Sequence, residues 1–433
     1  MSGADLDAIL IDGGWKGIPG GGRQLRVGDV AAQHWNLLAE DLPLPAALIR
    51  QSALAHNMAW MGRLLAAHDV MEAPHGKTAM CPGLVRRQIE AGAWGVTVSS
   101  SFQLQAYLRH GVRNFILANQ LVTRAAIDDV LAILAAREDV AVMVLVDSVA
   151  TVQRLAAGAA RRAMVRPLDV LLEVGADGGR SGCMNVQAGL EVARAVAATS
   201  GALRLCGIEG YEGVIAGDDP VIAERDVAGF LDRLAAVAAA CHSEGLLQDG
   251  TVTFSAGGSV YIDLVLDWWK NRLAFDGPRR LLVQTGSYVL SDSVLYPQAF
   301  ARMMERSPWM QAFGEGPRPV MELWSCVQAR PSPTRVTLTM GKRDTAEHYG
   351  LPVTRAWFRP GSHDRPQVLG KGNDIVVLND QHALMTCPAD SELAVGDMVA
   401  CGVCYPCGTT DKWRLLLEVD DAYNVVAAHP TFF

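Results

Sequence analysis

A lysine at the end of a short apolar run is the side chain in this sequence best placed to do chemistry. Lys77 belongs to the segment Glu72-Ala73-Pro74-His75-Gly76-Lys77-Thr78, where a strand is expected to end. Lysine is ordinarily a solvated cation. In a pocket its pKa falls, and the neutral amine then condenses with an aldehyde to form a Schiff base. A surface loop lysine is the alternative, and we take Lys77 as a candidate catalytic residue.

Two segments of small residues follow later apolar runs. They are Ser255-Ala256-Gly257-Gly258-Ser259 and Gln284-Thr285-Gly286-Ser287-Tyr288. Small residues let backbone N–H groups approach phosphate oxygens, and serine hydroxyls add donors. Plain connecting loops are the alternative for each segment taken singly. Both together, after the seventh and eighth strands of a barrel, favour a phosphate site.

Two further polar side chains also follow apolar runs. Arg180 closes the segment Glu173-Val174-Gly175-Ala176-Asp177-Gly178-Gly179-Arg180, and its guanidinium suits a phenolate or a phosphate. Tyr211 follows Gly210 at the end of the next run. A surface arginine and a core tyrosine are the alternatives. These positions predict that both side chains lie near Lys77.

The elements that must position these residues alternate between strand and helix. Apolar runs of strand length are separated by segments whose apolar residues recur at helical spacing. About eight such units fill residues 45–310, close to the ~250 residues of a (β/α)₈ barrel, which is an α/β fold. Strands are expected at 47–50, 69–71, 96–98, 115–118, 140–146, 170–173, 205–208, 252–254 and 281–283, and helices at 125–137, 186–198 and 222–241.

The pattern changes near residue 311 to short alternating strands without crossover helices. They are expected at 320–329, 335–340, 375–378 and 397–403. Such a pattern is typical of a β-domain. The chain is therefore divided into residues 1–44, which complete the β-domain, the barrel at 45–310, and the C-terminal β-domain at 311–433.

Composition excludes several classes of protein. The 433 residues are 50% hydrophobic, enough for a large core and two or three domains. A net charge of -8 argues against a nucleic acid partner. No window reaches the ~18 uninterrupted apolar residues of a membrane span. The acidic N-terminus is unlike a secretory signal, so a cytoplasmic protein with reduced thiols is expected.

The ordered set of motifs resembles the D-threonine aldolase and D-serine dehydratase family. The resemblance runs from about residue 40 to the C-terminus and also implies a head-to-tail homodimer with the active site near its interface. The family consists of pyridoxal-phosphate enzymes with an alanine-racemase-like barrel. The segments that carry the resemblance are His75-Gly76-Lys77-Thr78, Val146-Asp147-Ser148, Gly179-Arg180-Ser181-Gly182, Tyr211-Glu212-Gly213, Gly286-Ser287-Tyr288 and the final Tyr405-Pro406-Cys407-Gly408-Thr409-Thr410-Asp411-Lys412-Trp413.

The resemblance also implies a role for each matched residue. Lys77 binds the cofactor covalently and removes the substrate's Cα proton. Arg180 contacts the cofactor's O3′, and Tyr211 lies near its pyridine nitrogen. His75 and Tyr288 belong to the same cofactor-binding segments. The residues implied to hold the phosphate are Gly257, Gly258, Ser259, Gly286 and Ser287.

The C-terminal motif departs from the family pattern. In relatives it begins with histidine and supplies two metal ligands, whereas here Tyr405 stands first and Cys407 second. A phenol must lose a proton to bind zinc well, so a metal at Cys407 is an uncertain expectation. Tyr405 is instead a candidate acid/base. A thiolate cluster of Cys387, Cys401, Cys404 and Cys407 is a further alternative.

The leading hypothesis is a pyridoxal-phosphate-dependent lyase that acts on 3-hydroxy D-amino acids. Cys407 and the Asp411-Lys412-Trp413 tail favour the dehydratase type, which gives a keto acid and ammonia, over an aldolase. Racemisation or epimerisation is the alternative, because Tyr405 could act on the cofactor face opposite Lys77. A non-catalytic pyridoxal-phosphate-binding protein is a third possibility, which the large C-terminal domain disfavours.

Overall fold

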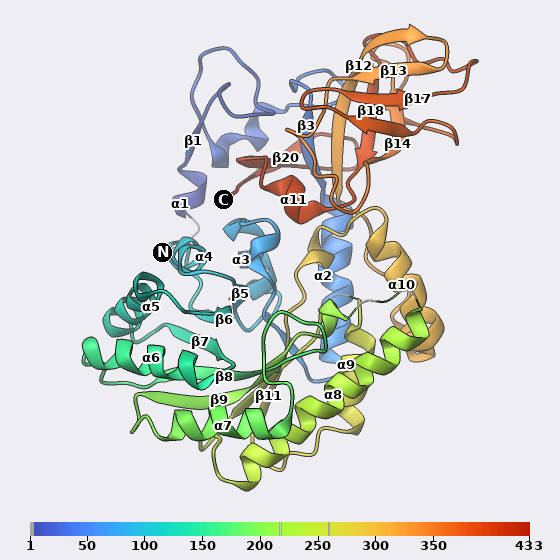
Figure 1. Cartoon of the computed structure of the whole chain (residues 1–433). Helices are drawn as coiled ribbons and strands as arrows, with labels where there is room; N and C mark the ends of the chain where they lie inside the picture. Colours follow the sequence, from blue (N-terminus) through green and yellow to red (C-terminus); the bar gives the residue numbers. More distant parts are fainter. Residues whose placement is uncertain (1–3, 216, 218, 259) are drawn as a thin grey trace.

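The computed structural model describes residues 4–215, 217, 219–258 and 260–433, and it has two lobes, a barrel and a β-domain (Figure 1). The barrel sheet is formed by β4 (Met71–Glu72), β5 (Val96–Val98), β6 (Asn114–Gln120), β7 (Ala141–Val146), β8 (Leu168–Val174), β9 (Leu203–Gly210), β10 (Val252–Ser255) and β11 (Arg279–Val283). These strands are parallel and lie in the order β4-β11-β10-β9-β8-β7-β6-β5. The N–H groups of Trp94 and Thr97 donate to the carbonyl oxygens of Glu72 and Pro74 at 2.8 and 2.9 Å, which closes the sheet between β5 and β4. The predicted barrel is confirmed.

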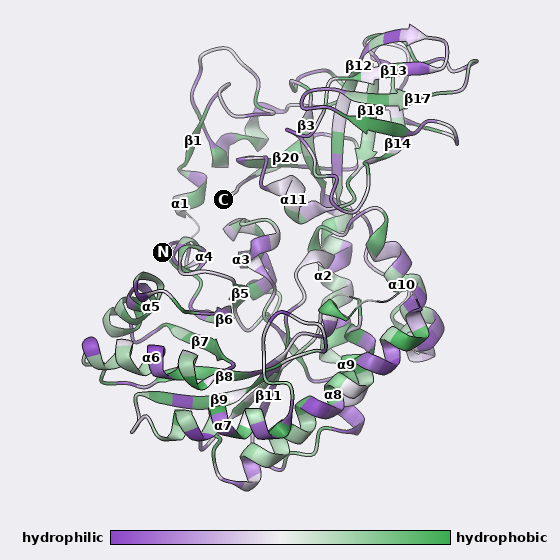
Figure 2. Ribbon diagram, viewed as in Figure 1, coloured by the Kyte–Doolittle hydropathy of each residue, from purple (hydrophilic) through white to green (hydrophobic). Residues whose placement is uncertain are grey.

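Helices cover the outside of this barrel, and green, apolar positions alternate with purple, hydrophilic ones along them (Figure 2). The apolar residues of α5 and α6 include buried Ile127, Leu131 and Leu155. Ser148 and Asn185 cap two of them, because their side-chain oxygens accept backbone N–H groups at 3.3 and 2.9 Å. The helices expected at 125–137, 186–198 and 222–241 are found as α5, α7 and α8. The helices of this lobe are α2 (Gln51–Ala66), α3 (Pro82–Glu90), α4 (Ser101–Arg109), α5 (Arg124–Ala136), α6 (Val149–Arg161), α7 (Val186–Ala197), α8 (Pro220–Ser243), α9 (Ile262–Asn271) and α10 (Leu295–Arg306).

The barrel interior changes from apolar to polar along the strands. Its apolar layer consists of Ala73, Ile116, Met143, Leu145, Leu171, Cys206 and Leu282. Beyond it, Glu173, Glu209 and Ser255 are level neighbours on β8, β9 and β10. Gln284 donates to Glu209 at 3.0 Å and to Ser255 at 2.9 Å. This polar layer lies at the carboxyl ends of the strands, where barrel enzymes place their active sites.

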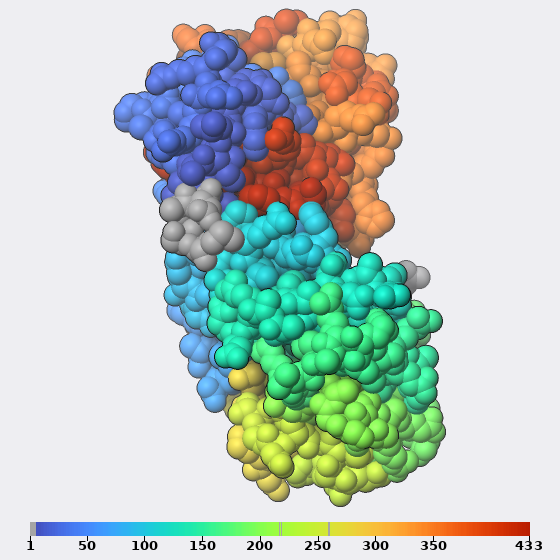
Figure 3. Space-filling model, turned by 90° about the vertical axis from the view of Figure 1, so that its left-hand side faces the viewer, coloured from blue at the N-terminus to red at the C-terminus, as the bar shows by residue number. Residues whose placement is uncertain are grey.

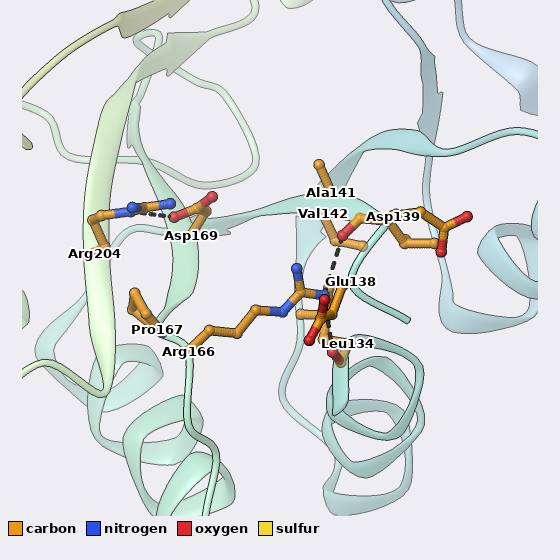
Figure 4. Close-up of a pocket in the computed structure, with 10 residues that line it drawn as sticks. Leu134, Glu138, Asp139, Ala141, Val142, Arg166, Pro167, Asp169 and Arg204 are labelled. Atoms are coloured by element: carbon orange, nitrogen blue, oxygen red, sulfur yellow. Dashed lines mark hydrogen bonds and ion pairs between the residues drawn. The ribbon is translucent and has the colours of Figure 1, made fainter. Parts of the chain in front are cut away.

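A pocket of ≈ 350 Å³ opens at the opposite, amino-terminal ends of β7, β8 and β9 (Figure 4). Arg204 pairs with Asp169 at 2.6 Å, and Arg166 donates to the carbonyl oxygens of Leu134, Arg137 and Val140. The charged side chains that line this pocket are therefore largely engaged with one another or with the backbone. It lies away from the candidate catalytic residues.

The second lobe is an antiparallel β-domain that includes a strand from before the barrel. Strand β3 (Ala46–Arg50) was expected at the start of the barrel, but it pairs with β12 (Met321–Ser332) and β19 (Leu415–Val419). An apolar strand suits either sheet, so the sequence pattern does not separate the two. The other strands of this lobe are β13 (Arg335–Leu338), β14 (Val353–Phe358), β15 (Gln367–Val368), β16 (Ile375–Leu378), β17 (Ala383–Thr386), β18 (Met398–Gly402) and β20 (Val425–Pro430).

The N-terminal residues pack on the β-domain. They form α1 (Ala4–Asp7) and a small hairpin of β1 (Leu10–Ile11) and β2 (Leu25–Arg26). Buried Ile11, Val30 and Leu37 share a core with Trp324 and Leu417. The space-filling view shows this blue segment beside the red C-terminal residues in the upper lobe (Figure 3). Among the residues described, no helix is long and apolar enough to cross a membrane.

Candidate active site

Lys77 lies in a tight turn at the carboxyl end of β4. The turn is a single 3-10 helix, η3 (Gly76–Thr78). The hydroxyl of buried Tyr107 donates to the carbonyl oxygen of Gly76 at 2.7 Å, and a Cβ on Gly76 would lie 2.5 Å from the Tyr107 ring. Glycine is therefore required beside the lysine, and the tyrosine below holds the turn. Within the described part of the chain, the ammonium of Lys77 has no ion-pair partner.

The surroundings of Lys77 lower the pKa of its amine. Part of the residue is exposed, yet the protein atoms around the ammonium lower its pKa by desolvation. The charge of Arg180 lowers the pKa further, whereas Cys407 acts in the opposite direction. Burial, followed by the charges of Lys77 and Arg180, lowers the pKa of His75 to about 3. His75 is thus neutral near pH 7, and its buried Nδ1 has no hydrogen-bond partner among the described residues.

Arg180 and Tyr211 approach Lys77 from the loops after β8 and β9. The Arg180 guanidinium lies 5.9 Å from the centroid of the Tyr211 ring. Burial and the neighbouring Glu212 raise the pKa of Tyr211 to about 12, although Arg180 acts against them. The phenol therefore keeps its proton. The structure brings these two predicted residues together with Lys77 and His75.

The two small-residue loops also converge on this end of the barrel. Gly257 has a φ of 102°, a conformation that favours glycine. A Cβ on Gly258 would lie 2.6 Å from the Tyr211 ring, and a Cβ on Gly286 would lie 2.6 Å from Cβ of His75. Glycine therefore permits close packing at both loops. Ser259 lies outside the described residues.

Tyr288 points away from this cluster, whereas Ser287 begins the short helix η5 (Ser287–Val289) beside it. The Tyr288 hydroxyl donates to the carboxylate of Glu72 at 2.9 Å and accepts from Gln88 at 3.1 Å. Burial raises the pKa of Glu72 to about 7. Tyr288 is 1% exposed. Its observed contacts are those of a core residue, and contact with a cofactor stays a prediction.

Tyr405 and Cys407 reach the site from the β-domain. They lie at the start of α11 (Pro406–Thr410), which is at the edge of the β-domain that faces the barrel (Figure 1) and contacts η3. Burial raises the pKa of the Cys407 thiol, against the effects of a hydrogen bond with Thr78 and the charge of Lys77. Burial also raises the pKa of Tyr405. Both groups are therefore protonated at neutral pH.

The donor groups around Cys407 do not fit a metal ion. Among the residues that the structure describes, no three His, Cys, Asp or Glu side chains are grouped so that they could hold one. Cys404 donates to the carbonyl oxygen of Leu351 at 2.9 Å, and Cys387 donates to that of Pro333 at 3.5 Å. Cys401 is fully buried in β18. The thiolate cluster considered from the sequence is therefore not assembled in the described residues.

Several residues at the site were not predicted. Tyr349 and His348 pack on Tyr405, with ring centroids 5.0 and 5.5 Å from its ring. They lie in a loop, where no sequence pattern marked them. Glu212 is also part of the site. Its place beside Tyr211 in the motif was a signal that could have identified it.

Comparison with known proteins places this geometry in a family. Residues 49–262 match the model of the alanine racemase N-terminal domain, and residues 320–419 match that of a "Putative serine dehydratase domain". The chain belongs to the D-threonine aldolase and D-serine dehydratase family. The family resemblance seen in the sequence is thus confirmed.

Relatives in this family align over parts of the chain. The 3-hydroxy-D-aspartate aldolase of Paracoccus denitrificans (strain Pd 1222) is 26% identical over 176 residues, which cover 40% of this chain and 44% of that protein. The aligned part thus spans less than half the length of that relative. The D-threo-3-hydroxyaspartate dehydratase of Delftia sp. (strain HT23) is 30% identical over 243 residues, or 52% of this chain and 63% of that protein.

Solved structures share the fold along nearly the whole chain. The D-threonine aldolase from Filomicrobium marinum has a TM-score of 0.74 at 22% identity and covers 92% of this chain and 97% of its own. At this identity the similarity shows the fold alone. This chain has an alanine-racemase-like barrel with a β-domain.

Proposed function

We propose that this chain is a pyridoxal-phosphate-dependent lyase that acts on 3-hydroxy D-amino acids and releases a keto acid and ammonia. The observation that carries this proposal is the lysine amine of lowered pKa at the end of β4, facing Arg180, Tyr211 and Cys407. Desolvated lysines of this kind react with carbonyl compounds. Family membership and the names of its relatives support the same reaction class.

The residues at the carboxyl ends of the strands fit this cofactor. Lys77 would bind its aldehyde carbon, and the guanidinium of Arg180 would contact its ring hydroxyl. The glycines at 257, 258 and 286 have no side chain, so a phosphate could approach their backbone N–H groups. The unpartnered Nδ1 of His75 is a further polar atom beside Gly286. When bound, the cofactor would accept the electron pair released as a bond at the substrate Cα breaks.

The protein's own groups would then move the protons. Lys77 is the proposed base for the Cα proton, because it lies at the site and its surroundings shift its pKa towards the neutral amine that a base requires. Tyr405 keeps its phenolic proton because burial raises its pKa, and it is the proposed donor to the departing β-hydroxyl. Tyr349 packs edge-on to Tyr405 at 5.0 Å and orients its ring. Loss of water and hydrolysis give the keto acid and ammonia.

The proposed reaction does not use a metal at Cys407. The thiol is protonated, and Tyr405 replaces the histidine of the family pattern. No additional acidic, cysteine or histidine side chains complete a ligand set in the described residues. Cys407 instead contacts the hydroxyl of Thr78 and lies within electrostatic range of Lys77. Its proposed role is to fix the position of α11 next to the lysine.

Racemisation or epimerisation is the second candidate. Tyr405 favours it, because a protonated phenol near Lys77 could return a proton to the opposite face of Cα. Aldol cleavage at Cα–Cβ is a third candidate, supported by the relatives named aldolases. The three reactions differ in which bond at the substrate breaks or re-forms.

The remaining assignments belong to the same proposal. They are a head-to-tail homodimer, a cytoplasmic location, and a boundary between the barrel and the C-terminal β-domain at residues 310–311. Incubation of the purified protein with pyridoxal phosphate and D-serine tests the function. Pyruvate and ammonia in equal amounts are expected. L-serine without pyruvate would identify a racemase instead.

A further inference from the structure

The carboxylate of Glu212 accepts hydrogen bonds from two neighbouring backbone N–H groups at the site. Glu212 begins the short helix η4 (Glu212–Val214) after β9 and is 0% exposed. Its Oε2 accepts from the N–H of Gly257 at 2.9 Å, and its Oε1 accepts from the N–H of Gly258. Two successive N–H groups directed at one anion form an oxyanion-binding nest. The turn is therefore shaped to bind an anion that presents two acceptor oxygens.

The same two amides are those expected to hold the cofactor's phosphate. Gly257 has a positive φ, and a Cβ at position 258 would clash with the Tyr211 ring, so both positions of the turn require glycine. The Glu212 carboxylate presents its two oxygens to these N–H groups as a phosphate would. Because each N–H makes one strong hydrogen bond, and because the anions repel each other, both cannot occupy the nest at once.

We propose that Glu212 is an internal anion that competes with the cofactor's phosphate for the amides of Gly257 and Gly258. This inference rests on the proposed function and names a residue that controls cofactor affinity. Before the cofactor binds, the carboxylate keeps the nest filled and the turn ordered. When a phosphate binds, the carboxylate gives up these amides.

The substitution Glu212→Gln tests the competition. Glutamine has the same size but no negative charge, so it holds the two amides less strongly. The probes are pyridoxal phosphate and pyridoxal, which share the ring and the aldehyde and differ in the phosphate. Titrations should show pyridoxal phosphate binding about tenfold more tightly to the variant, since charge-assisted hydrogen bonds are roughly twice as strong as neutral ones. Pyridoxal should bind both proteins equally.

The matched control is Glu244→Gln. Glu244 follows α8 and pairs with Arg194 at 2.7 Å on the surface, so this change removes the same charge away from the nest. Neither probe should bind the control differently. Inorganic phosphate alone supplies a second readout, and it should raise the melting temperature of Glu212→Gln at lower concentration than that of the native protein.

Distinct outcomes separate this inference from the proposed function. Unchanged or weaker binding of pyridoxal phosphate to Glu212→Gln would overturn the inference, as would an equal change for pyridoxal. Failure of native Lys77 to react with either probe would instead contradict the proposed function. If Glu212→Gln does not fold, Glu212→Asp decides, because the shorter side chain cannot reach both amides. Tighter binding to that variant is expected, and unchanged or weaker binding would overturn the inference.

Discussion

The hydroxyl of Thr410 donates a hydrogen bond of 2.6 Å to the carbonyl oxygen of Thr78. Thr410 is the last residue of α11 in the β-domain, and Thr78 is the residue after the candidate catalytic lysine. Both threonines are buried. This bond therefore couples the placement of Tyr405 and Cys407 to the turn that carries Lys77, although 332 residues separate the two ends.

Replacing Thr410 with valine should weaken the site more than the fold. Valine has a similar shape but leaves the Thr78 carbonyl oxygen without this donor, a loss of roughly 1–3 kcal/mol for a buried group. We expect a lower melting temperature and a larger loss of lyase activity than in Thr386→Val. Thr386 donates to Asp374 in the remote part of the β-domain. Equal activity in the two variants would show that the hydrogen bond from α11 to the Lys77 turn does not affect catalysis.

Substituting Gly286 with alanine should weaken cofactor binding. The added Cβ would lie 2.6 Å from Cβ of His75 and 3.0 Å from its backbone N, so the two loops must move apart. Overpacking of this kind costs about 1–3 kcal/mol, which predicts a fall of roughly tenfold or more in affinity for pyridoxal phosphate. Gly229→Ala in α8 is the control, because no atom beyond its own stretch of helix backbone lies within 4 Å of its added Cβ. Unaltered affinity in Gly286→Ala would show that this loop does not hold the cofactor.

Acid should weaken the ion pair between Glu418 of the β-domain and Arg87 of the barrel lobe. This buried carboxylate on β19 binds Arg87 of α3 at 3.0 Å and His429 of β20 at 2.6 Å. Burial alone would raise the pKa of Glu418, but the hydrogen bond with His429 and the charges of His429 and Arg87 lower it. Because the folded pKa lies below the unfolded value of about 4.3, the carboxylate stabilises the fold above that pH and loses this effect as the pH falls through the folded pKa.

The variant Glu418→Gln should therefore be less stable at pH 7, by about 3 kcal/mol for a broken buried ion pair. Between pH 5 and pH 3, the melting temperature of Glu418→Gln should fall less than that of the native protein. This window follows from the unfolded-state pKa of glutamate, about 4.3, and from the lower pKa of Glu418 in the folded protein. Thermal unfolding at both pH values measures the difference. Parallel curves for the two proteins would contradict the assigned pKa.

Changing Tyr405 to phenylalanine should distinguish the candidate reactions. If the phenol donates a proton to the departing hydroxyl, pyruvate formation from D-serine should fall by about 10²–10⁴-fold. Exchange of the Cα proton with deuterated water should continue, because Lys77 remains. If Tyr405 serves a racemase, deuterium incorporation from L-serine should disappear instead. If pyruvate formation and deuterium incorporation both proceed at native rates in the variant, Tyr405 is not a catalytic residue.

The barrel could be predicted because strands and helices have different apolar periods. That alternation located α5, α7 and α8 to within a few residues, and it placed Lys77 at a strand end. It assigned strand β3 to the wrong sheet, because a short apolar run contains no information about its partner. No pattern in the sequence indicates that Tyr288 turns towards Glu72.

Other features of the site depend on contacts between distant loops. The anion held by Gly257 and Gly258 is a side chain 45 residues away, so only the approach of β9 and β10 reveals it. The same holds for Tyr349, whose 51% exposed side chain reaches Tyr405 from a loop without regular structure. Tertiary contacts of this kind leave no periodic signal in a single sequence.

The most direct test of the account is to locate the lysine that binds the cofactor. The protein is incubated with pyridoxal phosphate and reduced with borohydride, and its peptides are then mapped by mass spectrometry. The account predicts a yellow protein whose pyridoxyl group is attached to Lys77, and a Lys77→Ala variant with neither the label nor activity. A pyridoxyl group attached to another lysine in the native protein would contradict it.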